Sequence, residues 1–473
     1  MAYKLKSKQE QEEQNMFTRA TRSIISSNGT LDVLFRDSML IYDQALYYLR
    51  QEYFRCRELE WKETPVYLSW MQLYYLVKET EAWKNSKLDI NPKNQAVKSA
   101  STAWSTWIKA KEDYKKNPGK YTGEPKMPRY LYRFTDWHEI KINKTRFRGT
   151  DGNKIRIPCT KIDLDVPSNL KKEWITEIVL SKNCGNVSVS FVYDLRKTGK
   201  YREMLEAMED KKPGTILAID MGKVNIVTGM TFGCGKNDGS FLIRGKYFTQ
   251  KINETTERIA SLESDAMTSK NKEVTKISKR DGQLKLCKNT HQMDSIWSSY
   301  DCFVDNQIGN ISSMIIDYCK ERNIEMIVIG YNEDWKRNIE LGRKNNREFC
   351  HIPHKRLLDA VRMKAEVLGI EFITVEESYT SKTDHMAGEA MCHHEHYIGR
   401  RVSRGKFVSS TGKIIHADVN GCIGMIRKAN VIPDAELIEG LRDRGDVVSP
   451  VVLNVRGINP RRQQISKIPG QKS

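Results

Sequence analysis

The sequence has no long apolar run. No stretch approaches the roughly 18 consecutive apolar residues that a membrane-spanning helix needs. The first residues, MAYKLKSKQEQEEQN, are polar where a secretory signal peptide carries an apolar segment. We therefore expect a soluble protein that is neither exported nor attached to a membrane.

Cysteine pairs of the C-x-x-C type are also missing. The ten cysteines are scattered along the chain, which excludes the regular spacing of a disulfide framework or a zinc ribbon. We expect reduced thiols in a cytoplasmic protein.

Basic residues, in contrast, are in clear excess. Lys and Arg number 78 against 60 for Asp and Glu, which gives a formal net charge of +18 over 473 residues. Such a balance favours a polyanionic partner, because each neutralised phosphate releases counterions, although a ribosomal or membrane-surface protein would share it. The length predicts about two to four domains.

The chain from Leu34 to Tyr121 has the apolar spacing of helices. One stripe consists of Tyr42, Leu46, Leu49 and Tyr53, and a second of Val97, Ala100, Trp104, Trp107 and Tyr114. Helix packing is the ordinary explanation of each stripe. The Lys and Arg beside these aromatic residues would also suit stacking on bases and contact with phosphates. Residues 117–133, rich in Pro, Gly and Lys, end the helical pattern.

Beyond this boundary the apolar period changes to two. Strands at 178–180 and 187–193 flank the turn sequence Asn-Cys-Gly-Asn. Together with residues 154–165 they predict a small antiparallel β-barrel.

A different domain begins near Pro213. Its expected strands are 215–220, 226–230, 240–248, 325–330 and 371–375, and its expected helices are 354–370 and 419–429. Three strands followed by alternating helix and strand is the order of an RNase H fold. Between the third and fourth strands we expect very basic helical segments that include Lys279 and Arg280, although a solvated helix face is an equally ordinary explanation of such a charge run. From Pro433 the chain turns polar, and we expect a disordered, RNA-contacting tail.

Acids stand where a two-metal phosphodiesterase needs them. Its carboxylates must come from different elements to hold ions about 3.5–4 Å apart, and hard oxygen ligands select Mg²⁺ or Mn²⁺. Asp220 ends an apolar strand, where an acid is costly unless a cation compensates it. Asp418 directly precedes the last helix, where helix capping is the ordinary alternative. The third acid is Glu376 or Glu377. Because side chains alternate along a strand, only one of the two can face the metals, and the sequence does not show which.

These segments resemble the transposon-encoded TnpB proteins and the small type V CRISPR effector nucleases. ILAIDMGKVNIVTG is similar to their first RuvC motif, and EESYTSK followed by HADVNGCIGMIRKA is similar to their TS segment and third RuvC motif. Upstream, NPKNQAVKSASTAWSTWIKAKEDY and GEPKMPRYLYR are similar to the end of their helical recognition segment. The resemblance extends from Leu34 to Ala429.

The chain departs from the family pattern at the second motif. The usual glutamate follows the fourth strand, where this chain has Gly330, and Glu333 lies on the loop beyond. In some branches the glutamate stands three residues before the TS threonine, which is Thr380 here. The resemblance therefore favours Glu377, then Glu376, then Glu333.

The second departure concerns zinc. Family members commonly carry two C-x-x-C pairs between the TS segment and the third motif. This chain has a single clump there, which consists of Cys392, His393, His394 and His396. A tetrahedral site draws its ligands from two separated turns, so we do not expect a structural zinc. Arg400, Arg401 and Arg404 would be free to contact nucleic acid.

The resemblance implies an α+β multidomain protein with five parts. These are a wedge-like β-barrel (1–33 and 125–212), a helical recognition domain that interrupts it (34–124), a RuvC nuclease domain of RNase H-like α/β fold (213–380 and 411–429), a degenerate zinc-finger-like target-nucleic-acid-binding insertion (381–410), and a basic disordered tail (430–473).

It also implies an RNA-guided DNA endonuclease. Asp220, Glu377 and Asp418 would be catalytic and would bind Mg²⁺ or Mn²⁺, while a guide RNA selects the target and the protein recognises a short adjacent motif. We expect double- and single-stranded target DNA as substrate, a monomer or homodimer on the RNA, and a bacterial or archaeal, nucleoid-associated location. Further nucleic-acid contacts are expected from Lys279, Arg280, Trp335, Lys336, Arg400, Arg401 and Arg404.

Two other functions are open alternatives. A nuclease-inactive descendant would bind DNA under RNA guidance and repress transcription, and the missing glutamate at Gly330 would suit it. A transposase or structure-specific nuclease would act without RNA.

Overall fold

The computed structural model describes two compact units, Met1–Tyr201 and Arg202–Ser473. The described residues are 17–58, 68–121, 123–131, 137–149, 152–183, 186–199, 201, 214–268, 277–280, 283–286, 290–332 and 352–455. Helices and sheets occur in both units, which confirms the expected mixed α+β multidomain fold. Within these ranges, no helix combines the length and apolar character needed to cross a membrane.

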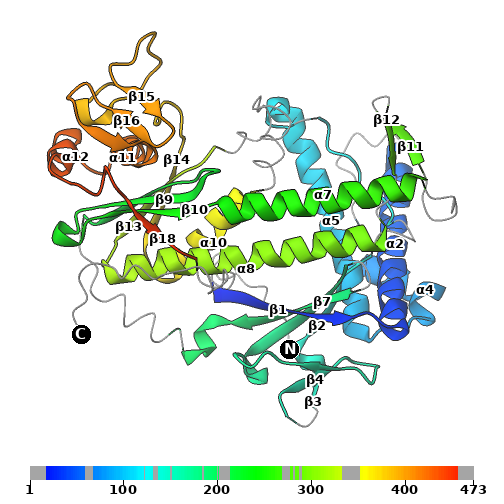
Figure 1. The fold of residues 1–473 in the computed structure, drawn as a ribbon. Helices are drawn as coiled ribbons and strands as arrows, with labels where there is room; N and C mark the ends of the chain where they lie inside the picture. The colour runs from blue at the N-terminus through cyan, green and yellow to red at the C-terminus, as the bar shows by residue number, and fades with distance from the viewer. Residues whose placement is uncertain are drawn as a thin grey trace. The chain divides into compact units, whose positions relative to one another are not determined.

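Helices form one part of the first unit. They are α2 (Gly29–Glu58), α3 (Trp70–Lys78), α4 (Glu81–Lys84) and α5 (Ile90–Lys116). The two long helices, α2 and α5, pack against each other (Figure 1). Leu46 and Leu49 of α2 and Trp104 and Trp107 of α5 are buried in one core. Helix packing therefore accounts for both apolar stripes.

A four-stranded antiparallel sheet forms the second part, in the order β1-β7-β6-β2. Its strands are β1 (Thr18–Ser26), β2 (Ile140–Asn143), β6 (Ile175–Asn183) and β7 (Asn186–Asp194). β6 and β7 pair as the predicted hairpin. β1 precedes the helices in sequence but pairs with β7, so the chain leaves this sheet for the helices and then returns to it.

The prediction of a single barrel is wrong. Residues 154–165 belong to a separate antiparallel sheet of β3 (Arg148–Gly149), β4 (Lys154–Arg156) and β5 (Asp163–Asp165). β4 pairs with β3 on one side and β5 on the other, so both of its edges are already used. Among the described strands, none joins the two sheets.

The second unit is built on a six-stranded sheet in the order β14-β13-β8-β9-β10-β18. Its strands are β8 (Ile216–Asp220), β9 (Asn225–Phe232), β10 (Ser240–Arg244), β13 (Met326–Gly330), β14 (Glu371–Val375) and β18 (Val451–Leu453). β8, β9 and β10 are antiparallel neighbours, whereas β13 and β14 run parallel to β8. This is the predicted order of three strands followed by alternating helix and strand.

Different helices cover the two faces of this sheet. They are α7 (Lys246–Thr268), α8 (His291–Glu321), α10 (His354–Val367) and α11 (Ala417–Ala429), of which α7 and α8 lie side by side (Figure 1). Ile219 and Ile329 share a core with residues of α8 and α10, whereas Ala218 and Val328 share one with residues of α11. Since side chains alternate along a strand, Asp220 lies on the α11 face.

Two predictions between the third and fourth strands were wrong. The third strand ends at Arg244, and α7 starts at Lys246 because Phe248 and Ile252 are buried at helical spacing. The basic segment is not wholly helical, since Lys279 and Arg280 lie in β11 (Ile277–Arg280), which pairs with β12 (Gln283–Leu286). The sequence QLKL alternates with the period of a strand.

The prediction of a disordered tail from residue 430 was also wrong. α12 (Asp434–Leu441) buries Leu437 and Leu441, which are spaced one helical turn apart. β18 then adds to the sheet edge as a parallel partner of β10. The polar composition hid these apolar contacts. Residues 456–473 lie outside the described part of the chain.

Candidate active site

Asp220 is the last residue of β8 and lies against α11. A Cβ atom at Gly421 of α11 would lie 3.0 Å from Asp220 Oδ2, so helix and carboxylate approach closely because residue 421 has no side chain. Burial and the negative charge of Asp418 raise the pKa of Asp220, and Arg401 partly offsets them. The carboxylate is therefore costly to ionise without an additional cation.

Asp418 lies in the first turn of α11 and not before it. The N-cap is His416, whose ring accepts a 3.3 Å hydrogen bond from the Asp418 backbone N–H, so the capping alternative for Asp418 was wrong. The Asp418 carboxylate accepts a 2.7 Å hydrogen bond from Asn225 Nδ2 and lies 3.4 Å from an Arg401 guanidinium nitrogen. The positive end of the helix dipole also favours an anion in this turn.

Glu377 follows β14 by two residues and is only partly exposed. Its backbone is fixed on both sides, because its N–H donates to Asn332 Oδ1 at 3.0 Å and its C=O accepts from the Thr380 hydroxyl at 2.8 Å. Burial and the charge of Asp220 raise the pKa of Glu377, while Lys428 lowers it. Among the described residues, its Oε1 is buried without a hydrogen-bond partner.

The two other candidates for the third acid differ from Glu377. Glu376 is exposed to solvent. Glu333 lies outside the described residues. The burial of Glu377 and its interaction with Asp220 favour it over Glu376.

The three acids thus meet in two pairs that share Asp220. The charge of Asp418 raises the pKa of Asp220, and the charge of Asp220 raises the pKa of Glu377. Within the described ranges, no three acidic, histidine or cysteine side chains are arranged closely enough to hold a metal ion as they stand. Their chemistry nevertheless fits a hard divalent cation, because like charges and an unpartnered carboxylate oxygen are what such a cation compensates.

Several supporting residues were not found from the sequence. Asn225 begins β9 and orients Asp418 while accepting a 3.1 Å hydrogen bond from Arg244. Lys428 donates to the backbone C=O of Glu376 at 2.8 Å and to the Ser378 hydroxyl at 2.7 Å, and so holds the turn that carries Glu377. A polar residue at the start of the apolar strand NIVTGMTF was the available signal for Asn225.

A three-stranded sheet precedes α11, and its first two strands lie within the predicted insertion at 381–410. Its strands are β15 (Arg400–Ser403), β16 (Lys406–Val408) and β17 (Ile414–His416). Arg400, Arg401 and Arg404 are exposed on this hairpin, and Arg401 lies near Asp418. Arg401 also donates to the backbone C=O of Arg404 within the hairpin, whereas its contact with Asp418 joins the hairpin to the candidate site.

The remaining predicted contacts are less informative. Lys279 and Arg280 are placed in β11, and Trp335 and Lys336 lie outside the described residues. In the cysteine and histidine clump, Cys392 Sγ lies 3.4 Å from His394 Nε2, and that nitrogen is also 2.8 Å from the Ala390 carbonyl.

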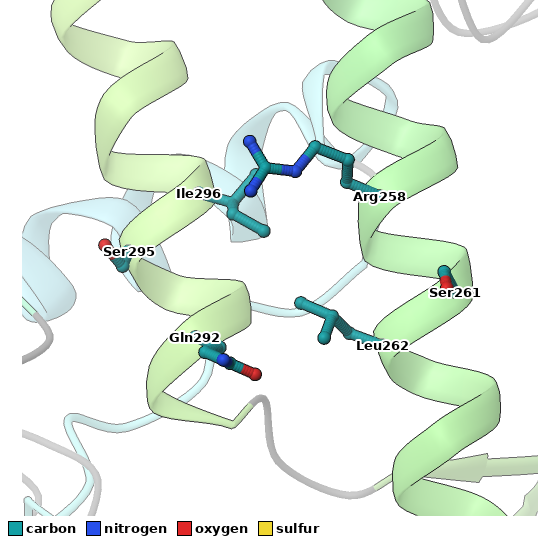
Figure 2. A pocket seen from close by; sticks show the side chains of 6 residues that line it. All are labelled: Arg258, Ser261, Leu262, Gln292, Ser295 and Ile296. Atoms are coloured by element: carbon teal, nitrogen blue, oxygen red, sulfur yellow. The ribbon is translucent and has the colours of Figure 1, made fainter.

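A pocket of about 380 Å³ lies between α7 and α8 (Figure 2). Its lining residues are Arg258, Ser261, Leu262, Gln292, Ser295 and Ile296. None of them is acidic, so this pocket lacks the ligands of a hydrolytic metal site. The candidate active site is instead the group of Asp220, Glu377 and Asp418 between the sheet and α11.

Comparison with known proteins agrees with the resemblance. Residues 354–425, which include Glu377 and Asp418, match the family model "Cas12f1-like, TNB domain". The curated "TnpB-like protein ORF457" of Acidianus two-tailed virus is 20% identical over 418 residues, which cover 83% of this chain and 81% of that protein.

Solved structures give weaker matches. A Cas12f1-sgRNA-target DNA complex matches with a TM-score of 0.47 at 12% identity, covering 84% of this chain and 82% of that one. The mini-RNA-guided endonuclease CRISPR-Cas_phi3 matches with a TM-score of 0.48 at 11% identity, covering 90% and 93%. Both scores are below one half, so the family assignment depends on the domain model and the viral relative. On those two findings, the chain is a relative of the TnpB/Cas12f-like proteins, with a Cas12f1-like TNB domain at residues 354–425.

Proposed function

We propose that this protein is an RNA-guided DNA endonuclease with a RuvC active site on an RNase H-like sheet. The observation that carries the proposal is the position of Asp220, at the end of a central strand and in electrostatic contact with both Asp418 and Glu377. Carboxylates from β8, from the turn after β14 and from α11 converge on one edge of the sheet, as phosphodiester hydrolysis by metal ions requires.

Asp220, Glu377 and Asp418 would hold Mg²⁺ or Mn²⁺. The bound ions would supply Lewis-acid stabilisation of the phosphate and a lowered pKa for an attacking water. Asn225 keeps one oxygen of Asp418 in a fixed hydrogen bond and leaves the other facing Arg401. The guanidinium of Arg401 provides a fixed positive charge beside the site, where the charge of a transferring phosphoryl group develops.

We propose that the first unit binds the guide RNA. It has a pocket of about 660 Å³ whose lining includes Arg148, Arg156 and Lys161. Arg156 is paired with Asp163, whereas Lys161 has no hydrogen-bond or ion-pair partner among the described residues. Clustered cations of this kind suit a phosphate backbone. We also propose the wedge, recognition and nuclease boundaries predicted from the sequence, RNA-guided target selection, and recognition of an adjacent motif by the protein.

The repressor alternative loses its main support if Glu377 replaces the missing glutamate. Gly330 alone would suggest a dead site. The carboxylate of Glu377 lies over Gly330, however, and senses the charge of Asp220. Three acids therefore remain available for cutting.

Sequencing of RNA that copurifies with the protein from its native locus tests the proposal. We expect one structured RNA species with a variable segment, and Mg²⁺-dependent cutting of a DNA that matches this segment. RNase-treated, RNA-free protein that cuts DNA equally well would favour an RNA-independent nuclease. A wild-type complex that binds matched DNA and never cuts would favour the repressor.

A further inference from the structure

A side chain at position 330 would overlap with the side chain of Glu377. A Cβ atom at Gly330 would lie 2.7 Å from Cγ and 2.7 Å from Oε1 of Glu377, and 2.3 Å from the terminal methyl of Met425. These distances are far below the ordinary contact between carbon atoms of about 3.5–4.0 Å. The carboxylate of Glu377 therefore occupies the place of a side chain at position 330.

The sheet register shows where a side chain from position 330 would point. β13 is parallel to β8, with Ile329 opposite Ile219. The next residues along the two strands are Gly330 and Asp220, which consequently lie on the same face of adjacent strands. A carboxylate on residue 330 would project beside Asp220.

Glu377 reaches this place from the outer side. β14 lies beyond β13, with Val375 opposite Gly330, and Glu377 is two residues further along. Its side chain returns over the end of β13 and lies near enough to Asp220 to respond to its charge. Hydrogen bonds from Thr380 and Lys428, together with the one that the Glu377 N–H donates to Asn332, fix the turn in this position.

We propose that Gly330 is a positioning residue for the third carboxylate. Its lack of a side chain is what lets Glu377 reach the site, and the site accepts a carboxylate from the end of β13 or from the turn after β14, but not from both. The inference rests on the proposed function insofar as Glu377 is taken as a metal ligand. It adds that the two positions are interchangeable.

Four variants test the proposal: Gly330→Ala, Glu377→Ala, Gly330→Glu/Glu377→Ala and Gly330→Gln/Glu377→Ala. Removing the Glu377 side chain clears Cγ and Oε1, and the remaining obstacle, the Met425 methyl, ends a flexible side chain that can move. The Gln swap is the matched control, since it has the same size and no charge. Mn²⁺ binding to the RNA-bound protein is measured by electron paramagnetic resonance, with DNA cleavage as a second readout.

We expect Gly330→Ala and Glu377→Ala each to weaken Mn²⁺ binding roughly 10–100-fold. Gly330→Glu/Glu377→Ala should bind Mn²⁺ at least about tenfold more tightly than Gly330→Gln/Glu377→Ala. A purely structural role of Gly330 would not produce this difference. If the two swaps bind Mn²⁺ equally, if neither swapped protein folds, or if Gly330→Ala binds and cuts like wild type, the proposal is overturned. If the Mn²⁺ pattern holds but no protein cuts guided DNA, the proposed function fails while the role of Gly330 stands.

Discussion

Asn225 donates a 2.7 Å hydrogen bond to Oδ2 of Asp418, and this contact ties the start of β9 to the first turn of α11. The two residues are 193 positions apart in the sequence. Asn225 is buried, and Arg244 donates to its side-chain oxygen, so the amide orientation is fixed. The orientation of one candidate ligand on a helix is therefore set by a neutral side chain from strand β9.

Replacing Asn225 with Ala should reduce cleavage of matched DNA about 10–100-fold, because Asp418 loses the partner that orients it. The Mg²⁺ concentration for half-maximal rate should rise. Steady-state cleavage at several Mg²⁺ concentrations measures both effects. Asn237→Ala, in an exposed turn of the same unit, is the control and should behave like wild type. An unchanged Mg²⁺ dependence in Asn225→Ala would exclude the orienting role.

Arg401→Gln should slow cleavage roughly 100-fold, since a fixed cation beside the reacting phosphate is lost. Arg401 lies 3.4 Å from Asp418, whereas in the described part of the chain no ion pair or hydrogen bond joins its neighbour Arg400 to the three acids. Arg400→Gln is therefore the matched control and should change DNA binding more than the cleavage rate. Single-turnover rates at saturating protein separate these effects. Equal losses in both variants would mean that Arg401 acts only in binding.

Acid should destabilise the first unit through His138. Burial lowers the pKa of His138 from 6.5 to about 4, and its Nδ1 lies 2.8 Å from the Ser38 hydroxyl. In the unfolded chain His138 is protonated below about pH 6.5, whereas in the folded chain it stays neutral down to about pH 4. The contribution of neutral His138 to the unfolding free energy is therefore fully present above pH 6.5 and is lost as the pH falls towards 4. Over this window the loss attributable to His138 is roughly 3 kcal/mol.

Urea unfolding followed by tryptophan fluorescence between pH 7.5 and pH 4 checks this prediction. His138→Gln should flatten the decline in unfolding free energy. His396→Gln, at an exposed position, should leave the decline unchanged. Parallel curves for His138→Gln and wild type would show that another group causes the acid sensitivity.

The segment after Pro433 should contribute to the stability of the second unit. Leu437 is fully buried, so Leu437→Ala should lower the unfolding free energy by about 2–5 kcal/mol. Glu439→Ala, on the exposed side of the same helix, should have little effect. Hydrogen exchange of α12 and β18 would report local loss directly. Equal stability of both variants would restore the expectation of an unstructured tail.

The sequence was most informative where a local pattern decided the outcome. The apolar run before Asp220, the strand before Glu377 and the helix that carries Asp418 all have patterns that a few neighbouring residues define. β18 could not be predicted, because its pairing with β10 joins segments about two hundred residues apart. The same holds for Asn225 and Lys428, whose roles depend on contacts across the fold.

The position of Gly330 illustrates the difference. From the sequence alone, Gly330 indicated that the usual glutamate ligand of the second motif is missing. The structure places the Glu377 carboxylate over it, and only the distance between these two residues reveals the relation. Size complementarity between a strand residue and a distant turn residue is not encoded in a local pattern.

Single-turnover cleavage of RNA-matched double-stranded DNA by wild type and Asp220→Asn is the most direct test. Both proteins should carry the same copurified RNA and bind the target with similar affinity. We predict that wild type cuts with Mg²⁺ and stops with EDTA, and that Asp220→Asn is at least about 1,000-fold slower, since the central carboxylate is lost. Cutting by Asp220→Asn at the wild-type rate would contradict the assignment of this site.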